Sequence, residues 1–389
     1  MRLLSFSVSN FRSFLVEQTI TFDSGSKNVD AILGPNGSGK SNLFWALGFF
    51  RDFIRLSTKF EGQTMQYMSF IFNDKSEMLP TSLQAEMQTT KYTYKYHFSI
   101  LLGEIKDEAL SRKLNSGNSG YETLFSRRSL DKNRYEKYGF DSSMLKSTRA
   151  DALVLTKAWE NNNKYALDVF EWLDHLKLVS GNQPINQTAQ KMVEDSNFKT
   201  KLLDLLHRAD LSIQDITASK INLPEEVFNN LPIKDEFKKG MDRTGYNLMT
   251  THIVRSSNGE VVDTKQLPMS LESEGTRRIF ELAFPVIDTL KHGNILYVDE
   301  FENHLHPREC EFLVELFTGE ENTSESQLII NTHNTQVIDQ VGRNNVHLLG
   351  KNSREETMIA GIPKDVRTDD PALEKKYNKG VFGAVPNVG

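Results

Sequence analysis

Apolar and polar residues alternate along the first part of the chain, with short interruptions. An alternation with a period of two is typical of strands that bury one face. A short apolar run, Asp30–Leu33, leads into a glycine-rich loop, and the apolar residues after that loop recur at helical spacing. The pattern therefore predicts a lobe of strands around one helix over residues 1–103. Its expected elements are strands at 2–9, 16–22 and 30–33, a turn at Asn10-Phe11-Arg12-Ser13, a helix at 41–56 and a hairpin over 82–102.

Between residues 104 and 222 the chain becomes richer in charged residues and helix formers. Apolar residues recur at helical spacing over 153–176 and again over 188–211, where Asp195-Ser196 has the composition of a second helix start. Glycine, proline and asparagine interrupt these segments too often for the sustained heptads of a long coiled coil. We therefore expect a helical insertion over 104–222.

Short apolar strands and amphipathic helices alternate towards the C-terminus. Such alternation is typical of a parallel sheet covered by helices. The whole chain is thus predicted to be α/β, with an antiparallel N-terminal β-subdomain, a helical insertion and a C-terminal lobe over 223–389. The elements expected here are strands near 217–222, 248–263, 294–298 and 327–331, and helices after Gly275 and near 308–317.

The bulk composition narrows the class of protein. The chain has 389 residues, 38% of them hydrophobic, which is enough to build a buried core. Its formal net charge of −6 excludes a strongly basic surface for nucleic acid, although a local patch stays open. The single cysteine, Cys310, excludes an internal disulfide and fits a reducing compartment. No signal peptide is evident and no apolar run approaches the roughly 20 residues that span a bilayer, so we expect a cytoplasmic location.

The clearest chemical signal is the sequence GPNGSGKS, between the predicted strand 30–33 and the predicted helix 41–56. Glycines let the backbone wrap tightly, so that successive N–H groups and the helix N-terminus point at phosphate oxygens. Lys40 is expected to neutralise β/γ-phosphate charge, and the Ser41 hydroxyl to bind Mg²⁺. The alternative, a chance glycine turn, is disfavoured by this strand–loop–helix context. The predicted phosphate-binding residues are Gly34, Pro35, Asn36, Gly37, Ser38, Gly39, Lys40 and Ser41, followed by Asn42.

Two further predicted strands end in polar side chains. Ile295–Val298 is followed by Asp299 and Glu300, at the strand end where ligands bind in open α/β sheets. We expect Asp299 to hold Mg²⁺ and Glu300 to act as the general base for an attacking water. The second strand, in LIINTHN, ends at His333, which could reach a γ-phosphate. Solvated acids and a structural histidine are the alternatives.

The stretch Ser273-Glu274-Gly275-Thr276 precedes an apolar, helix-periodic run. Its simple interpretation is a helix start, with Ser273 as the cap and Glu274 placed favourably at the helix N-terminus. A helix N-terminus with serine and glycine can also bind phosphate. Because the loop at Gly34–Ser41 already serves that purpose within the chain, a second phosphate binder would serve another copy. Both interpretations stay open.

In order along the chain, NFRS, GPNGSGKSN, ESEGT, ILYVDE, NHLHP and NTH resemble an ABC-type, AAA-family ATPase head of the kind found in RecF, SMC and OLD proteins. The resemblance implies an ATP- and Mg²⁺-dependent homodimer or higher oligomer. Ser273, Glu274, Gly275 and Thr276 stand where that class has its signature, but Glu274 replaces a glycine and Thr276 replaces Gln or Glu. The resemblance also makes His333 a switch histidine, residues 303–307 a D-loop and Arg12 a nucleotide contact.

Three less specific motifs resemble a narrower bacterial family. EKKYNKGVFGAVPNVG, VFEWLDHLKLVSG and LHRADLSIQDI are similar to the short ATPases of abortive-infection operons, such as RloA, the AbiL ATPase and, more distantly, AriA of PARIS. This implies anti-phage defence beside a separately encoded, often nuclease-like effector. The residues after His333 carry no convincing cluster of acidic metal ligands, since Asp365, Asp369 and Asp370 fit a polar loop. The alternatives are a DNA-repair ATPase that clamps DNA and a nucleotide-locked scaffold.

One stretch, residues 125–140, interleaves basic and aromatic residues. Such a pattern can contact nucleic acid or an acidic partner. Asp131 and Glu136 dilute the charge, so a solvated helix face is the favoured interpretation. The basic residues are Arg127, Arg128, Lys132, Arg134 and Lys137.

Overall fold

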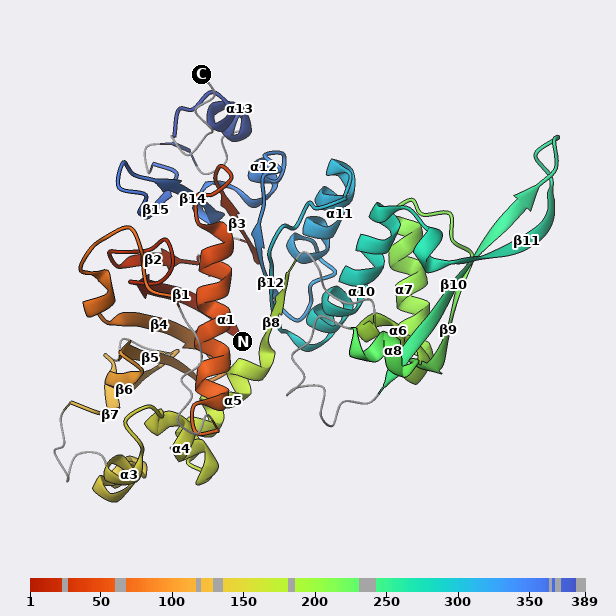
Figure 1. The fold of residues 1–389 in the computed structure, drawn as a ribbon. Helices are drawn as coiled ribbons and strands as arrows, with labels where there is room; N and C mark the ends of the chain where they lie inside the picture. Colours follow the sequence, from red (N-terminus) through yellow and green to blue (C-terminus); the bar gives the residue numbers. More distant parts are fainter. Residues whose placement is uncertain are drawn as a thin grey trace. The chain divides into compact units, whose positions relative to one another are not determined.

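The computed structural model divides the chain into two compact units, which are described separately (Figure 1). The first unit contains Met1–Gly181, Thr289–Glu302 and Leu313–Gly389, and the second contains Asn182–Asp288 and Asn303–Phe312. The structure describes residues 1–22, 27–59, 68–116, 120–128, 136–180, 186–230, 243–363, 366–367 and 372–382.

The first unit contains an antiparallel sheet of six strands in the order β2-β1-β4-β5-β6-β7. One face of this sheet is buried against helix α1 (Lys40–Leu56), as the alternating burial along β4 shows. Phe50 of α1 lies with its ring 5.8 Å from Phe6 and 5.6 Å from Phe98, so aromatic packing fixes the helix on the sheet. The strands are β1 (Arg2–Ser9), β2 (Gln18–Thr21), β4 (Thr81–Gln88), β5 (Tyr92–Leu101), β6 (Glu104–Leu114) and β7 (Glu122–Ser126).

The other sheet of the first unit is mixed and has the strand order β15-β14-β3-β13-β12-β8. All of its pairs are parallel except β14 with β15. Every residue of β3, β12 and β13 is buried, as expected for strands covered on both faces. The strands are β3 (Val29–Leu33), β8 (Leu176–Val179), β12 (Ile295–Val298), β13 (Gln327–Asn331), β14 (Val346–Lys351) and β15 (Thr357–Gly361).

This strand order confirms the predicted α/β fold with an antiparallel N-terminal sheet. The sheet that the alternation predicted to be parallel is mixed, because β15 runs antiparallel to β14. Because β3, β12 and β13 are neighbours and run parallel, the segments after them meet at one edge. Those segments are the glycine-rich loop, Asp299-Glu300 and the residues up to His333. Helix α12 (Val337–Val341) packs on β3, and α13 (Leu373–Asn378) packs on α12. Helix α11 (Pro307–Thr318) is shared between the two units.

The structure divides the chain differently from the expected boundaries at 103 and 222. Residues 104–114 form β6, which pairs with β5 along its length, and the chain stays in the first unit up to Gly181. Apart from the buried Glu108, the charged residues of β6 are exposed or half-buried, so a composition that favours helix is also compatible with a strand that lies between β5 and β7. The expected C-terminal lobe, 223–389, is likewise shared between the two units.

The predicted helix at 153–176 is two helices, α4 (Val154–Glu160) and α5 (Lys164–His175), followed by β8. Three asparagines separate them. Asn162 has a φ of 57°, and the Asn163 side chain accepts from the backbone N–H of Tyr165 at 3.0 Å, which caps α5. A short helix α3 (Ser142–Ser147) precedes this pair.

The second unit combines helices with a three-stranded antiparallel sheet in the order β11-β10-β9. The expected start at Asp195 is confirmed, because its carboxylate accepts from the N–H groups of Asn197 and Phe198. The expected strand 248–263 is instead a hairpin, which turns at Ser256–Gly259. The elements are α6 (Asn186–Glu194), α7 (Ser196–Arg208), β9 (Asp215–Asn222), α8 (Glu225–Asn229), β10 (Thr244–Arg255), β11 (Val261–Pro268) and most of α10 (Glu274–His292). None of the helices in the described ranges has the length and apolar character needed to cross a bilayer.

Candidate functional site

A cavity of about 250 Å³ lies in the first unit at the edge where β3, β12 and β13 end. It brings together most of the residues that the sequence singled out, although these are far apart along the chain. Gly34, Pro35 and Arg12 are not among its lining residues. The lining residues are Asn36, Gly37, Ser38, Gly39, Lys40, Ser41, Asn42, Asp299, Glu300, Asn331 and His333.

The glycines of the loop are required for different reasons. A Cβ on Gly34 would lie 2.2 Å from the backbone oxygen of Leu349, and one on Gly39 would lie 2.3 Å from Oγ1 of Thr357. A Cβ on Gly37 would meet nothing within 4 Å, but its φ of +77° disfavours any side chain. The loop is therefore pressed against β14 and β15 on one side, and its turn at Gly37 faces open space.

Lys40 begins α1 and is buried. Its ammonium donates to the backbone oxygens of Gly34 at 2.7 Å and Pro35 at 3.2 Å. Burial lowers the pKa of Lys40 to about 8, and the carboxylates of Glu302 and Asp299 offset only part of this effect. An ammonium that is held by two neutral oxygens inside a cavity is suited to bind an incoming anion, which would supply the missing negative charge.

Asp299 follows β12 and is held by two neighbours. Ser41 donates from Oγ to Oδ1 of Asp299 at 3.3 Å, and Nδ2 of Asn331 donates to the same oxygen at 2.7 Å. Asn331 also donates to the backbone oxygen of Lys40 at 3.0 Å and accepts from the Tyr297 hydroxyl at 2.9 Å. The fully buried Asn331 thus fixes the position of the carboxylate relative to the start of α1.

Glu300 and His333 complete the cavity. Glu300 is exposed and has a φ of 52°, a left-handed conformation that is uncommon for a non-glycine residue. The backbone N–H of His333 donates to Oε1 of Glu302 at 2.6 Å, which fixes the end of β13. Burial and the charge of Lys40 lower the pKa of His333, so its imidazole is neutral at neutral pH.

The N-terminal turn supports the glycine-rich loop from outside the cavity. Nδ2 of Asn42 and Oγ1 of Thr357 each lie 2.8 Å from Oγ of Ser13. Thr357 also donates to the backbone oxygen of Ser38 at 2.9 Å. Arg12 has its guanidinium 3.5 Å from Oδ1 of Asn42 and 5.7 Å from the ring of Trp45, so it lies beside the loop.

The Ser273–Thr276 stretch begins α10 in the second unit. Oγ of Ser273 accepts from the backbone N–H of Thr276 at 3.1 Å, which confirms the predicted helix cap. Glu274 lies 2.8 Å from Nδ1 of His304. A Cβ on Gly275 would lie 3.0 Å from the backbone oxygen of His304, so the segment 303–307 is packed against the helix start. A role for this stretch towards another copy stays a prediction.

The sequence did not identify four residues of this arrangement. Asn331 is a polar residue in an otherwise apolar buried strand, and such a residue must have a hydrogen-bond partner, so it could have been flagged. Glu302 follows the expected carboxylates closely. Ser13 and Thr357 carry no local signal, because their bonds join segments from opposite ends of the chain.

The basic stretch at 125–140 is paired within the chain where it is described. Arg127 lies 3.4 Å from the buried Glu108, Arg128 lies 3.1 Å from Asp107, and Lys137 lies 3.8 Å from Glu122. These pairs tie the stretch to the antiparallel sheet. Lys132 and Arg134 lie outside the described residues, as do Asp365, Asp369 and Asp370.

Solved structures with a similar arrangement include two SMC heads and RecF. The SMC head domain from Thermotoga maritima shares 13% identity at a TM-score of 0.43 and covers 93% of this chain and 100% of its own. The Smc head from Pyrococcus furiosus, bound to the C-terminal domain of ScpA, shares 12% identity at a TM-score of 0.44. The match covers 93% of this chain and 96% of the Smc head. The recombination mediator protein RecF shares 15% identity at a TM-score of 0.37, and the match covers 85% of this chain and 92% of RecF. Since all three TM-scores are below 0.5, family membership does not rest on them.

Comparison with curated proteins found no match. A family match covers residues 31–339, which includes the glycine-rich loop, the Ser273–Thr276 stretch, Asp299-Glu300 and His333. This range is well over half of the chain and contains every residue that lines the cavity. The chain belongs to the family described as "AAA domain, putative AbiEii toxin, Type IV TA system".

Proposed function

We propose that the chain is an ABC-type ATPase that binds ATP and hydrolyses it to ADP and phosphate. The observation that carries this proposal is the single cavity lined by Lys40, the Ser41–Asp299 pair and Glu300. A buried ammonium, a hydroxyl beside a carboxylate and an exposed second carboxylate are the groups that phosphoryl transfer to water requires.

The residues fit ATP and Mg²⁺. The backbone N–H groups of Asn36–Asn42 and the start of α1 would cradle the β- and γ-phosphates, with Lys40 as the matched cation. Ser41 and Asp299 offer oxygen ligands 3.3 Å apart, the type of donor that Mg²⁺ prefers. Mg²⁺ would neutralise charge that develops on the phosphate oxygens.

The two carboxylates, Asp299 and Glu300, have different proposed roles. Asn331 and Ser41 hold Asp299, whereas Glu300 is exposed at the cavity and can accept a proton. Glu300 would take the proton of a water whose oxygen attacks the γ-phosphorus, while the bond from that phosphorus to the β–γ bridging oxygen breaks. The neutral His333 would donate a hydrogen bond to the γ-phosphate and not add a charge.

The active form is proposed to be a homodimer or a higher oligomer with composite ATP sites. Ser273, Gly275 and Thr276 begin a helix of 19 residues, whose N-terminus favours an anion. The phosphates are already provided for by Asn36–Asn42 of the same chain. The Ser273–Thr276 stretch would therefore contact the γ-phosphate that is bound by another copy.

The biological role proposed is anti-phage defence by abortive infection, in the bacterial cytoplasm. The family description, which names AbiEii and toxin–antitoxin systems, supports this reading. The narrower likeness to RloA, the AbiL ATPase and AriA suggests a separately encoded effector, nuclease-like in chemistry, that the ATPase would control. Plaque counts on cells with the intact operon or with Lys40→Ala would test it, since the variant should lose protection.

Two variants test the site. Lys40→Ala should abolish ATP binding, because the backbone donors alone cannot balance the phosphate charge. Glu300→Gln should bind ATP and hydrolyse it about 10²–10⁴ times more slowly, because the amide lacks a basic oxygen. Unchanged ATP affinity in the first variant would falsify the assignment of the phosphate loop.

The composite site is tested by mixing two inactive variants, Lys40→Ala and Ser273→Asp. Aspartate can replace serine as the cap of α10 but repels phosphate, and Ser273→Asn is the matched uncharged control. Gly275 is less suitable, because any side chain there presses on His304 of the same chain. In a mixed dimer one site holds both lesions and the other holds none.

If the stretch acts in trans, ATPase activity plotted against mixing ratio should rise and fall. Activity that stays at background in confirmed heterodimers would argue for a cap alone, or for sites that cannot fire separately. A covalently linked dimer that carries both substitutions in one half separates these cases. If the stretch is only a helix cap, the unchanged half keeps an intact site and part of the activity. If both sites must fire together, the linked dimer stays inactive.

A further inference from the structure

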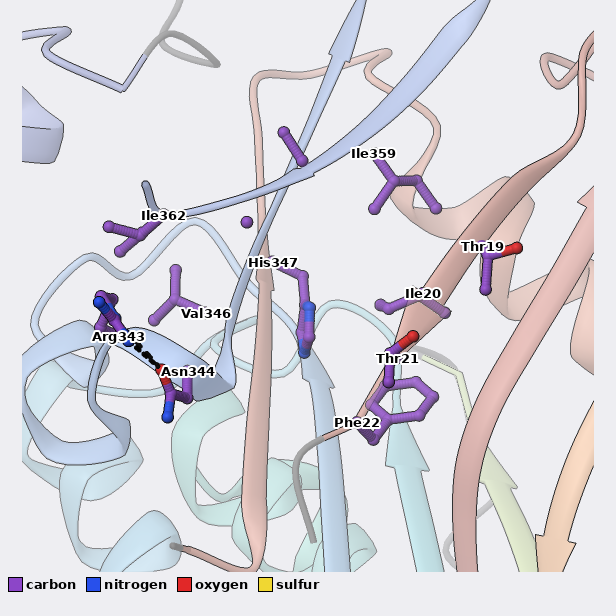
Figure 2. A pocket seen from close by; sticks show the side chains of 12 residues that line it. Thr19, Ile20, Thr21, Phe22, Arg343, Asn344, Val346, His347, Ile359 and Ile362 are labelled. Carbon is purple, nitrogen blue, oxygen red and sulfur yellow. Dashed lines mark hydrogen bonds between the residues drawn. The ribbon is translucent and has the colours of Figure 1, made fainter. Parts of the chain in front are cut away.

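A cavity of about 820 Å³ lies in the first unit beside β2, β14 and β15 (Figure 2). Two of the residues that line it are bonded within the chain. The N–H of Ile359 donates to Oε1 of Gln18 at 2.9 Å, which ties β15 to β2. Nε2 of His347 lies 3.1 Å from Oδ1 of the buried Asp30. These contacts hold strands together, and their role is structural.

A polar cluster of a different kind lies in the second unit, directly before the Ser273–Thr276 stretch. It consists of Glu272, which precedes this stretch, and of Thr250 and His252 in β10. Oε1 of Glu272 lies 2.7 Å from Nε2 of His252 and accepts from the Thr250 hydroxyl. Because a carboxylate is an acceptor, His252 donates from Nε2. The Glu272 side chain is 9% exposed, so this contact is shielded from water.

The two partners of Glu272 belong to the middle of a sheet. β10 pairs with β11 on one side and with β9 on the other. Thr250 and His252 are two residues apart, so they lie on the same face of β10. Thr250 is fully buried, and its Oγ1 lies 3.0 Å from the backbone oxygen of Leu267 in β11. Glu272 is therefore anchored to a paired strand.

One peptide unit joins Glu272 to Ser273, and contacts hold both of its sides. On one side, the Glu272 side chain is bound to β10, and its backbone N–H donates to the backbone oxygen of Met269 at 3.2 Å. On the other side, Oγ of Ser273 accepts from the N–H of Thr276 at 3.1 Å. Two anchors, the sheet and the first turn of α10, thus determine where the Ser273 hydroxyl lies.

A helix cap alone does not require a buried carboxylate beside it. Ser273 already supplies the side-chain cap of α10. A carboxylate that is removed from water costs stability that an apolar side chain of similar volume would avoid, and such a group can be retained because it fixes one geometry. A requirement that Ser273 lie at one fixed place accounts for a glutamate at position 272.

We propose that Glu272 is a positioning residue for ATP hydrolysis at the composite site. In the proposed function, on which this role rests, Ser273 of one copy contacts the γ-phosphate that is bound by another. Glu272, held by His252 and Thr250, fixes Ser273 for that contact and does not touch ATP itself. Binding of ATP by Lys40 in the first unit does not depend on Glu272.

Variants of Glu272 and His252 isolate this contact. Glu272→Leu removes the acceptor at a similar volume, and the Thr250 hydroxyl keeps the backbone oxygen of Leu267 within reach. Glu272→Gln keeps an acceptor oxygen and is the conservative variant. His252→Leu removes the donor from the other side. Glu260→Leu is the matched control, because it removes an exposed glutamate from the same hairpin.

Steady-state ATPase rates and titration with a fluorescent nucleotide give the first test. Because a misplacement of about 1 Å can cost about 10²-fold in rate, Glu272→Leu should lower kcat by about ten- to hundredfold. ATP affinity should stay within about twofold of the wild type, since the lost interaction is made only during hydrolysis. Glu272→Gln should keep most of the rate, and Glu260→Leu all of it. His252→Leu should add little to Glu272→Leu, since both variants break one contact.

Mixing experiments show through which residue Glu272 acts. In a heterodimer of Glu272→Leu with Lys40→Ala, both substitutions fall in one composite site and the other site is intact, so activity should return. In a heterodimer of Glu272→Leu with Ser273→Asp, each site carries one substitution, so activity should stay low. A general folding defect in Glu272→Leu would give the same result with both partners.

Four results would overturn the role of Glu272 alone: a wild-type kcat in Glu272→Leu, a Glu272→Gln variant as slow as Glu272→Leu, additive losses with His252→Leu, or equal activity in the two mixtures. If the wild-type chain does not hydrolyse ATP, or if Lys40→Ala mixed with Ser273→Asp stays inactive, the proposed function is contradicted, and the role of Glu272 with it. Circular dichroism must show that the variants fold. If Glu272→Leu does not, His252→Leu takes its place in each assay.

Discussion

Replacing Asn331 by leucine removes the residue that links three parts of the ATP cavity. The side chain is fully buried and makes three hydrogen bonds, to Asp299, to the backbone of Lys40 and to Tyr297. Leucine has a similar volume, so the substitution deletes the hydrogen bonds and leaves no large cavity. We expect Asn331→Leu to lower both the stability of the first unit and its affinity for ATP.

The magnitude follows from the groups left behind. The Tyr297 hydroxyl is buried and would lose its acceptor, and Oδ1 of Asp299 would keep only the longer bond from Ser41. Each buried polar group without a partner costs about 1–3 kcal/mol, so the two together cost about 2–6 kcal/mol. A domain has a free energy of unfolding of about 5–15 kcal/mol, so this loss is a large part of the total.

Tryptophan fluorescence during urea unfolding is the appropriate assay. All three tryptophans, Trp45, Trp159 and Trp172, lie within Met1–Gly181, so the signal reports on the first unit. Tyr297→Phe is the matched control, because it removes the hydroxyl that Asn331→Leu would leave unpaired. In the Tyr297→Phe background the leucine substitution should cost less, by about 1 kcal/mol.

Two results would refute this reasoning. If Asn331→Leu unfolds within about 0.5 kcal/mol of the parent, the three bonds do not hold the site together. If Asn331→Leu lowers the free energy of unfolding by the same large amount in the parent and in the Tyr297→Phe background, the Tyr297–Asn331 hydrogen bond does not contribute to that loss.

Further predictions concern the ionisable groups and the loop. ATP affinity, measured by titration with a fluorescent nucleotide, should fall as pH rises above about 8, the pKa of Lys40, because the phosphates then meet a neutral amine. In the same titration, Lys40→Arg should bind ATP with little pH dependence over about pH 7–10, because arginine stays charged. The free energy of unfolding should change with pH in the opposite direction to ATP affinity. Because folding lowers the pKa of Lys40 from 10.5 to about 8, the unfolded chain binds more protons than the folded chain between these pH values. The free energy of unfolding from urea titrations should therefore rise from about pH 8 to about pH 10.5. Gly39→Ala should lower the melting temperature more than Gly37→Ala, because only the former Cβ collides with Thr357, and calorimetry that ranks them the other way would contradict the contact. The pH–rate profile should show no acid limb at the ordinary histidine pKa of 6.5, because burial lowers the pKa of His333, and His333→Asn should lower the ATPase rate at neutral pH.

The part of the site that the sequence could predict is the part written in continuous segments. β3, β12 and β13 are short buried apolar runs, and each is followed directly by the residues that line the cavity. Parallel neighbours place those ends at one edge, so the meeting of Lys40, Asp299 and His333 follows from chain direction. The strand order itself required the structure.

The parts that escaped prediction depend on contacts between distant segments. Asn331 bonds to residues 34 and 291 positions away, and no local pattern reveals such partners. β8 directly follows α5, and its first residue, Leu176, continues the helical spacing, so the start of this strand was assigned to the helix. β6 carries enough charge to resemble a helix, and its pairing with β5 and β7 makes it a strand.

The position of β3 has a consequence for the synthesis of the protein. β3 (Val29–Leu33) emerges from the ribosome early, but its two neighbours, β13 and β14, begin at Gln327 and Val346. At about 5–20 residues per second, this strand waits roughly 15–60 s for its partners. We expect arrested nascent chains to retain ATP only when their exposed part includes β14, which an ATP-affinity pull-down at graded chain lengths would measure.

The delay couples activity to completion. A translation product that stops before Val346 lacks one neighbour of the strand that carries the phosphate loop, and the loop has no wall at Leu349 and Thr357 to press against. Such a fragment would expose an apolar strand to chaperones and proteases, and it would not assemble a nucleotide site. For a chain proposed to trigger a response harmful to its own cell, the order of the strands would act as a safeguard against unfinished copies.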